Sequence, residues 1–222
     1  MKIKNLCTAA ILGLVTTLTA TSASAIINVT IGGTSVADEG IVSSVAGAIT
    51  TNFNGSFANP AGYFGGGVVN GNSAPSGQYA SPPNDTSNYF SVGPSTIEAA
   101  IINTGLASYF GYYGGSPDDY NNVSFFNSAT ESLIATFTGT QLATFAGVEP
   151  NGDQSVGFFW NFTASDSVSY FDTVVFDSID YNAFETDNHA VLAAAVPEPE
   201  TYAMMLIGMG MIGFTARRRK SD

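Results

Sequence analysis

The sequence predicts an all-β domain, which we expect to be a single jelly-roll-like β-sandwich with a targeting segment on either side. Short stretches in which apolar and polar residues alternate recur throughout residues 26–196, and such alternation is typical of half-buried strands. Glycine, proline, asparagine and aspartate separate these stretches. No part of this region keeps a helical periodicity over ten residues. Many short strands joined by turns favour a sandwich or a barrel.

The alternating stretches define the expected strands. The clearest is 155–162, where alternate residues are bulky and apolar, whereas in 169–177 apolar residues occupy both faces. The turn Gly93-Pro94 is expected to join 88–92 and 96–102 in a hairpin. The remaining strands are expected at 26–31, 48–53, 67–69, 109–113, 123–127, 131–138, 184–187 and 190–195.

The region 26–196 is expected to fold as one domain. It is long enough to bury a sizeable core and too short for two ordinary domains. The single cysteine of the chain, Cys7, precedes this region. The domain therefore contains neither a disulfide nor a thiol.

The first 25 residues are typical of a secretory signal peptide. Two lysines precede an apolar stretch at 6–19, and the small residues Ala23 and Ala25 then form an A-x-A cleavage site. We therefore expect export, with a mature chain that begins at Ile26.

Residues 197–222 combine three unlike features in a fixed order. A stiff strip comes first, because prolines fix φ and bias the preceding residue toward an extended conformation; it consists of Pro197, Glu198 and Pro199. An uncharged apolar run follows at 202–216, and we expect it to be a short transmembrane helix, since a span usually needs about 20 residues. A cationic cluster that should stay on the cytoplasmic side comes last, formed by Arg217, Arg218, Arg219 and Lys220.

This order of features resembles the PEP-CTERM sorting signal of bacterial surface proteins. The resemblance rests on about a tenth of the chain and implies that exosortase, a membrane-embedded transpeptidase, recognises Pro197-Glu198-Pro199. Proteins with this signal usually come from Gram-negative bacteria that make exopolysaccharide. The resemblance therefore implies a precursor anchored in the inner membrane, and then a place at the cell surface or in the extracellular matrix of a biofilm.

The charge of the domain excludes one class of partner. All six lysines and arginines lie in the terminal segments, so region 26–196 holds 15 acidic residues and one histidine, a formal charge of −15. Nucleic-acid binding is excluded because phosphate contacts need lysine or arginine. The mutual repulsion of the acidic groups must be offset by burial, screening or bound cations.

A second resemblance concerns the domain itself. The stretch 109–121 is rich in glycine and aromatic residues and continues into Ser116-Pro117-Asp118-Asp119-Tyr120-Asn121, and 184–188 reads Phe-Glu-Thr-Asp-Asn. Both are similar to stretches in many exosortase-dependent surface proteins. The resemblance implies a jelly roll like those of carbohydrate-binding modules.

The sequence does not indicate an enzyme. His189 stands alone, whereas zinc sites draw several ligands, and no Gly-x-Ser-x-Gly elbow occurs. A glycosidase needs two facing carboxylates, and no pattern pairs the available glutamates, which are Glu98, Glu131, Glu149 and Glu185. We expect a non-enzymatic surface or matrix protein that binds polysaccharide. The alternative is a secreted polysaccharide-acting enzyme of the glycoside hydrolase type.

Two kinds of ligand contact are expected in the domain. Oxygen-rich loops at 118–119, 151–153 and 185–188 suit Ca²⁺, although the same residues also make ordinary turns; the best candidate ligands are Glu185, Asp187 and Asn188. Aromatic faces can stack on sugar rings, although such residues also form cores. The candidates for glycan contact are Tyr112, Tyr113 and Trp160.

Overall fold

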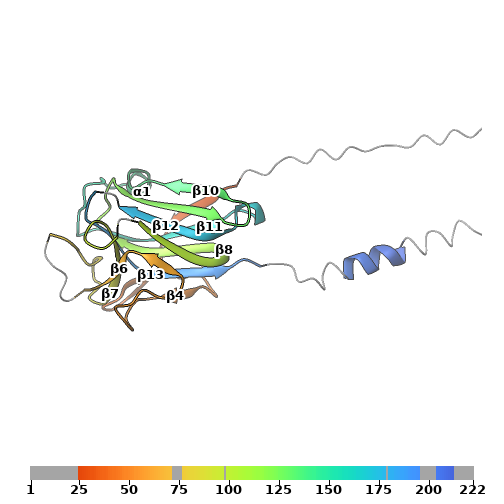
Figure 1. The fold of residues 1–222 in the computed structure, drawn as a ribbon, viewed down its shortest axis with the longest axis horizontal. Helices are drawn as coiled ribbons and strands as arrows, with labels where there is room; N and C mark the ends of the chain where they lie inside the picture. Colours follow the sequence, from red (N-terminus) through yellow and green to blue (C-terminus); the bar gives the residue numbers. More distant parts are fainter. Residues whose placement is uncertain (1–24, 72–76, 98, 179, 196–203, 213–222) are drawn as a thin grey trace, which may run out of the picture.

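A computed structural model describes residues 25–71, 77–97, 99–178, 180–195 and 204–212 (Figure 1). The region 26–195 is mostly β, which confirms the all-β part of the predicted fold class. Its strands are β1 (Ile27–Ile31), β2 (Thr34–Val36), β3 (Gly40–Val42), β4 (Ile49–Thr51), β5 (Tyr63–Gly65), β6 (Gly67–Asn70), β7 (Asn88–Val92), β8 (Ala99–Gly115), β9 (Asn121–Asn127), β10 (Ser132–Phe137), β11 (Gly157–Ala164), β12 (Phe171–Ser178) and β13 (Phe184–Ala193). A short 3-10 helix spans Ser167–Ser169, and α1 spans Gly139–Ala146.

Eleven of these strands form one antiparallel sheet. The strand order is β10-β9-β12-β8-β13-β7-β6, with β11 and β5 also paired to β8, β1 paired to β11, and β4 paired to β13. The strands β2 and β3 form a separate two-stranded sheet. The two sheets expected of a jelly-roll sandwich are therefore replaced by a single sheet that curls (Figure 1).

The long strand β8 explains this difference. Its first half pairs with β5 and β12, and its second half pairs with β11 and β13. Between the halves, the pairing with β12 is irregular. Phe171 of β12 pairs with Ala107 of β8, but Thr173, two residues later, pairs with Asn103, four residues earlier in β8. This irregularity contains Gly105, whose φ is 65°, and such bulges bend a strand. One bent strand thus joins the two expected strands 96–102 and 109–113.

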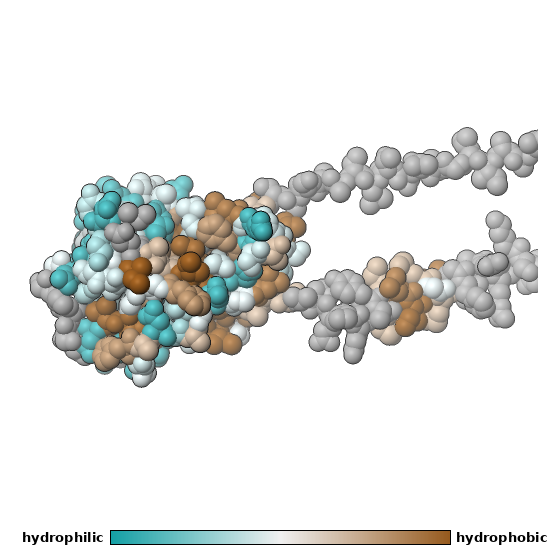
Figure 2. Space-filling model, in the orientation of Figure 1, coloured by the Kyte–Doolittle hydropathy of each residue, from teal (hydrophilic) through white to brown (hydrophobic). Residues whose placement is uncertain are grey.

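The core lies where the curled sheet closes on itself. Phe125 of β9 packs against Phe162 of β11, with ring centroids 5.0 Å apart, and against Phe171 of β12 at 4.9 Å. The surface also carries apolar residues, which Figure 2 shows in brown among polar ones. Two of these, Phe64 of β5 and Ile101 of β8, are exposed and pair across neighbouring strands.

Several pairings differ from those expected. The predicted hairpin of 88–92 and 96–102 is wrong, because β7 pairs with β6 and β13 and not with β8. The predicted strands 184–187 and 190–195 are one strand, β13, in which the register with β8 shifts between Asp187 and Ala190. The residue at this shift, Asn188, has a φ of 52°, which asparagine tolerates better than most residues.

The helix α1 was not expected. It has a complete capping box, in which the Thr138 side chain accepts from Gln141 N and the Gln141 side chain accepts from Thr138 N. Gly147 ends the helix in the left-handed conformation, as glycine commonly does. With eight residues, the helix is too short to show an apolar periodicity.

The expected targeting segments lie mostly outside the described residues. The residues that the structure does not describe include Ala23 of the expected cleavage site, the expected recognition residues 197–199 and the basic residues 217–220. Residues 204–212, within the expected span 202–216, form a helix. In the part of the chain that the structure describes, no helix has both the length and the apolar character needed to cross a membrane.

Candidate functional site

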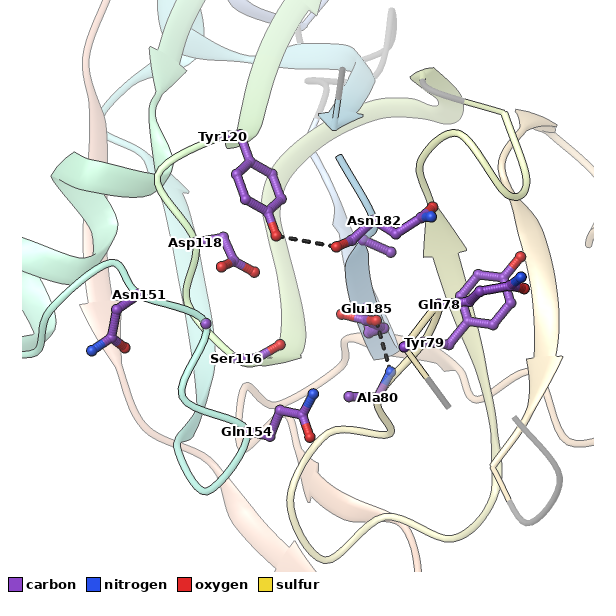
Figure 3. A pocket seen from close by; sticks show the side chains of 13 residues that line it. Gln78, Tyr79, Ala80, Ser116, Asp118, Tyr120, Asn151, Gln154, Asn182 and Glu185 are labelled. Carbon is purple, nitrogen blue, oxygen red and sulfur yellow. Dashed lines mark hydrogen bonds between the residues drawn. The ribbon is translucent and has the colours of Figure 1, made fainter. Parts of the chain in front are cut away.

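Four segments far apart in the sequence line a cavity of about 260 Å³ (Figure 3). They are residues 77–80, the turn after β8, the loop before β11, and the approach to β13 with the first residues of that strand. The lining residues are Gly77, Gln78, Tyr79, Ala80, Ser116, Asp118, Tyr120, Asn151, Gly152, Gln154, Asn182, Ala183 and Glu185. Oxygen-rich loops that the sequence singled out separately thus meet at one place.

Backbone contacts hold these loops together. Gly152 N donates to Pro117 O at 2.9 Å, and Asp118 forms an isolated antiparallel bridge with Asn151. The first residue of α1, Gly139, packs against the backbone carbonyl of Asp118. The capped helix therefore supports one wall of the cavity.

Glu185 is a buried acid on β13 whose carboxyl group faces the cavity (Figure 3). Only 3% of the residue is exposed, and its Oε1 accepts from Ala80 N at 2.8 Å. Burial, which disfavours the charged form, raises the pKa of Glu185 to about 8. At neutral pH the group is therefore largely protonated and can donate a hydrogen bond to a ligand.

Asp118 supplies a second carboxyl group to the same cavity. The residue is 8% exposed, and burial raises its pKa to about 6, with the neighbouring charge of Asp119 adding to the effect. The hydroxyl of Tyr120 donates to Asn182 O at 3.2 Å, across this end of the cavity (Figure 3). The Asp118 carboxyl group is thus mostly ionised at pH 7, whereas the Glu185 carboxyl group is mostly neutral.

The chemistry of the lining suits a neutral ligand rich in hydroxyl groups. Carboxyl, amide and phenol groups that converge on a cavity with perturbed pKa values are the usual marks of a binding site. The charge available to a ligand is negative or zero, because the domain contains no lysine or arginine. The cavity is therefore matched to neutral or amine-bearing ligands and mismatched to anions.

The candidate calcium ligands do not converge. Glu185 lines the cavity, but the Asp187 carboxyl accepts from Ser87 Oγ at 3.2 Å, and Asn188 Nδ2 donates to Glu39 O at 2.6 Å. Among the described residues, no group of three or more histidine, cysteine, aspartate or glutamate side chains is arranged to hold a metal ion.

The candidate glycan contacts are buried. Tyr112, Tyr113 and Trp160 are 1%, 2% and 4% exposed. The Tyr112 ring stacks on Phe162 with centroids 5.8 Å apart, and the Tyr113 hydroxyl donates to Pro83 O at 2.5 Å. In this structure the three rings belong to the interior, and their faces are not open to a sugar.

The other residues weighed for catalysis also find definite places. Glu131 and Glu149 are exposed and do not line the cavity, and Glu98 lies outside the described residues. His189 is 1% exposed, bonded to Tyr63 Oη at 3.1 Å and to Thr186 Oγ1 at 2.8 Å. Burial lowers the pKa of His189 to about 3.

Sequence reasoning missed several lining residues. Gln78, Tyr79, Gln154 and Asn182 occur in turn-rich segments, where polar residues are common, so nothing distinguishes them in the sequence. Ser116 lies in the Gly- and Tyr-rich run that had been noted for its resemblance. That run was the only feature of the sequence that could have indicated Ser116 as a lining residue.

Comparison with protein families identifies the C-terminal region. Residues 195–220 match the family model for the PEP-CTERM protein-sorting motif. The chain carries a PEP-CTERM sorting motif. The match confirms the resemblance inferred from Pro197-Glu198-Pro199 and the segments after it, and the PEP-CTERM motif implies processing by exosortase. No curated protein and no solved structure matches the chain.

Proposed function

We propose that this chain is an exported surface or matrix protein that exosortase sorts, and that its β domain is a non-enzymatic module for binding exopolysaccharide. The observation that carries the sorting role is the PEP-CTERM motif at 195–220. The polar cavity around Asp118 and Glu185 supports the binding role.

In this proposal the precursor is held at the inner membrane of a Gram-negative bacterium before release. Residues 1–25 direct export, 202–216 anchor the precursor as a transmembrane helix, and 217–220 stop transfer. The exposed apolar side chains of the 204–212 helix support the anchoring role, because such a surface is costly in water.

Replacing Pro197, Glu198 and Pro199 by alanine tests the sorting role. We expect the native host to convert the wild-type chain to a shorter form in the medium or at the surface, while the variant stays full-length in membranes. The double variant Glu149→Ala and Pro150→Ala, in a loop of the domain, serves as the control and should be processed normally. Normal processing of the triple variant would contradict the proposal.

The composition of the cavity predicts the class of polysaccharide. Neutral or amine-bearing polymers should bind, whereas uronic or sulfated polymers should not, since no cation of the domain offsets their charge. The mature protein can be tested against such a panel, with Glu185→Gln and Asn182→Ala as cavity variants and exposed Glu131→Gln as the control. Equal binding of anionic polymers, or unchanged binding by both cavity variants, would refute this assignment.

One observation favours a second candidate function. Two carboxyl groups line one cavity with pKa values of about 6 and about 8, and separated pKa values are what acid–base hydrolysis of a glycoside requires. Release of reducing ends from a bound polysaccharide, lost in Asp118→Asn, would establish this alternative.

A further inference from the structure

A second acidic site lies apart from the cavity and plays no part in the proposed function. Asp85 and Asp187 are 4% and 0% exposed. The hydroxyl of Ser87 donates to Asp85 Oδ1 at 2.6 Å and to Asp187 Oδ2 at 3.2 Å. One hydroxyl proton is thus shared between two buried carboxyl groups, so the acceptor capacity of the pair exceeds the donors it receives.

Asn188 belongs to the same place. Its backbone N donates to Asp187 Oδ1 at 2.6 Å, and its side-chain Nδ2 donates to Glu39 O at 2.6 Å. Glu39 in turn forms an antiparallel bridge with Asp85. These contacts define one group of side chains, which we name the buried acid cluster: Asp85, Ser87, Asp187 and Asn188.

Two oxygen atoms of the buried acid cluster accept no hydrogen bond from an N–H or hydroxyl donor among the described residues. They are Asp85 Oδ2 and Asn188 Oδ1, both of which are buried. A buried oxygen without a hydrogen-bond donor is destabilising, and more so when it is charged. Native proteins seldom leave such groups unmatched, so these atoms point to a missing electrophilic partner.

No protein cation can be that partner. Residues 26–196 contain no lysine or arginine, and both ring nitrogens of the nearby His189 already have hydroxyl partners, Tyr63 and Thr186. The carboxyl groups of Asp85 and Asp187 also lie close enough together for a direct side-chain hydrogen bond. The arrangement is therefore unfavourable to ionised carboxylates unless a positive charge from solution joins them.

We propose that the buried acid cluster is a calcium-binding site. The available ligands are carboxylate, amide and hydroxyl oxygens, the set that a hard cation prefers. Calcium accepts six to eight such ligands in flexible geometry, whereas magnesium demands a near-ideal octahedron. The site joins β13 to the segment before β7 and differs from the sequence expectation, because Asp85 takes the place of Glu185.

The test uses the mature protein, stripped with EDTA and titrated with CaCl₂ at pH 7.5. Calorimetry should show one site with a Kd of about 10⁻⁴–10⁻³ M, the range of extracellular modules. The melting temperature should rise with CaCl₂, and less with MgCl₂ or with NaCl at matched ionic strength. Asp85→Asn should weaken calcium binding at least tenfold, whereas Glu185→Gln and the exposed-site control Asp180→Asn should not.

A double variant tests the site in case Asp85→Asn alone prevents folding. Asp85→Asn combined with Asp187→Asn removes both charges at constant shape, so this variant should fold and melt at one temperature with or without CaCl₂. The proposal fails if wild-type protein shows no calcium-specific shift, or if Asp85→Asn binds as tightly as wild type. The two carboxyl groups would then share a proton instead of an ion.

Discussion

His189 shows how one polar residue is accommodated in an aromatic interior. Its ring lies 4.9 Å from that of Phe53, 5.3 Å from Phe176 and 5.7 Å from Tyr63, measured between centroids. Both ring nitrogens have hydroxyl partners, and burial favours the neutral imidazole because it lowers the pKa of His189. It therefore serves the packing of the core and has no access to a substrate.

The neutral state of His189 predicts a pH dependence. Its pKa is about 3 in the folded chain and 6.5 ordinarily, so between these values the unfolded chain binds a proton that the folded chain does not. As pH falls through this range, the free energy of unfolding of the wild type should therefore decrease by about 1.4 kcal/mol per pH unit relative to that of His189→Gln. Urea unfolding at pH 7, 5 and 4 in EDTA measures this difference, and parallel stability curves would contradict it.

Gly139 is the second residue whose identity the structure explains. A Cβ at this position would collide with the carbonyl oxygen of Asp118 and approach Asn121 O to 2.9 Å. Both are backbone atoms, one of the cavity-lining Asp118 and one at the start of β9, and cannot move aside freely. Only glycine therefore lets α1 lie against this wall.

Gly139→Ala should accordingly destabilise the domain by about 1–3 kcal/mol, the usual cost of overpacking, and should weaken ligand binding at the cavity. Gly55→Ala is the matched control, because a Cβ there meets nothing within 4 Å. Chemical denaturation of both variants provides the comparison. Equal free energies of unfolding for the two variants would show that the backbone around Gly139 shifts to accommodate the added methyl group.

At the scale of elements, the sequence predicted strands well and their connections poorly. Alternation located β7 and β11 closely because each has a well-defined apolar pattern. The bulge in β8 that curls the sheet involves no unusual residue beyond Gly105. The three-residue strands β2, β3 and β5 were missed, because three residues cannot show a period.

The candidate site was predictable only in pieces. The loops containing Asp118, Asn151 and Glu185 were each noted as rich in oxygen ligands, yet nothing in the sequence placed them together. Their meeting depends on β8 and β13 lying side by side, which is a long-range pairing. The burial of Trp160 and Tyr112 depends on the same closure of the sheet.

The capping box of α1 makes a prediction at this scale. Thr138→Ala removes the side-chain acceptor of Gln141 N and should cost about 1 kcal/mol. Thr144→Ala, at an exposed position of the same helix, should be neutral or slightly stabilising because alanine favours helices. Thermal unfolding of the two variants measures this difference, and Thr138→Ala should melt at the lower temperature. Equal melting temperatures, or a lower one for Thr144→Ala, would show that the cap is unimportant.

At the scale of the whole molecule, the charge of −15 in region 26–196 opposes compactness. The Debye length falls from about 30 Å at 0.01 M salt to about 10 Å at 0.1 M. The melting temperature of the mature protein should therefore rise over this range. A variant with four exposed acids changed to amides, Asp119, Asp153, Glu131 and Glu149, should respond less, and a flat response in wild type would contradict the expectation.

The place of β13 has a mechanical consequence. This strand immediately precedes the sorting region in the chain and is hydrogen-bonded along both edges, to β8 on one side and to β7 and β4 on the other. Tension applied from an anchored C-terminus would pull β13 lengthwise, perpendicular to those hydrogen bonds. The bonds would then be loaded in shear together instead of opening one at a time, so the domain resists being unravelled from its tethered end.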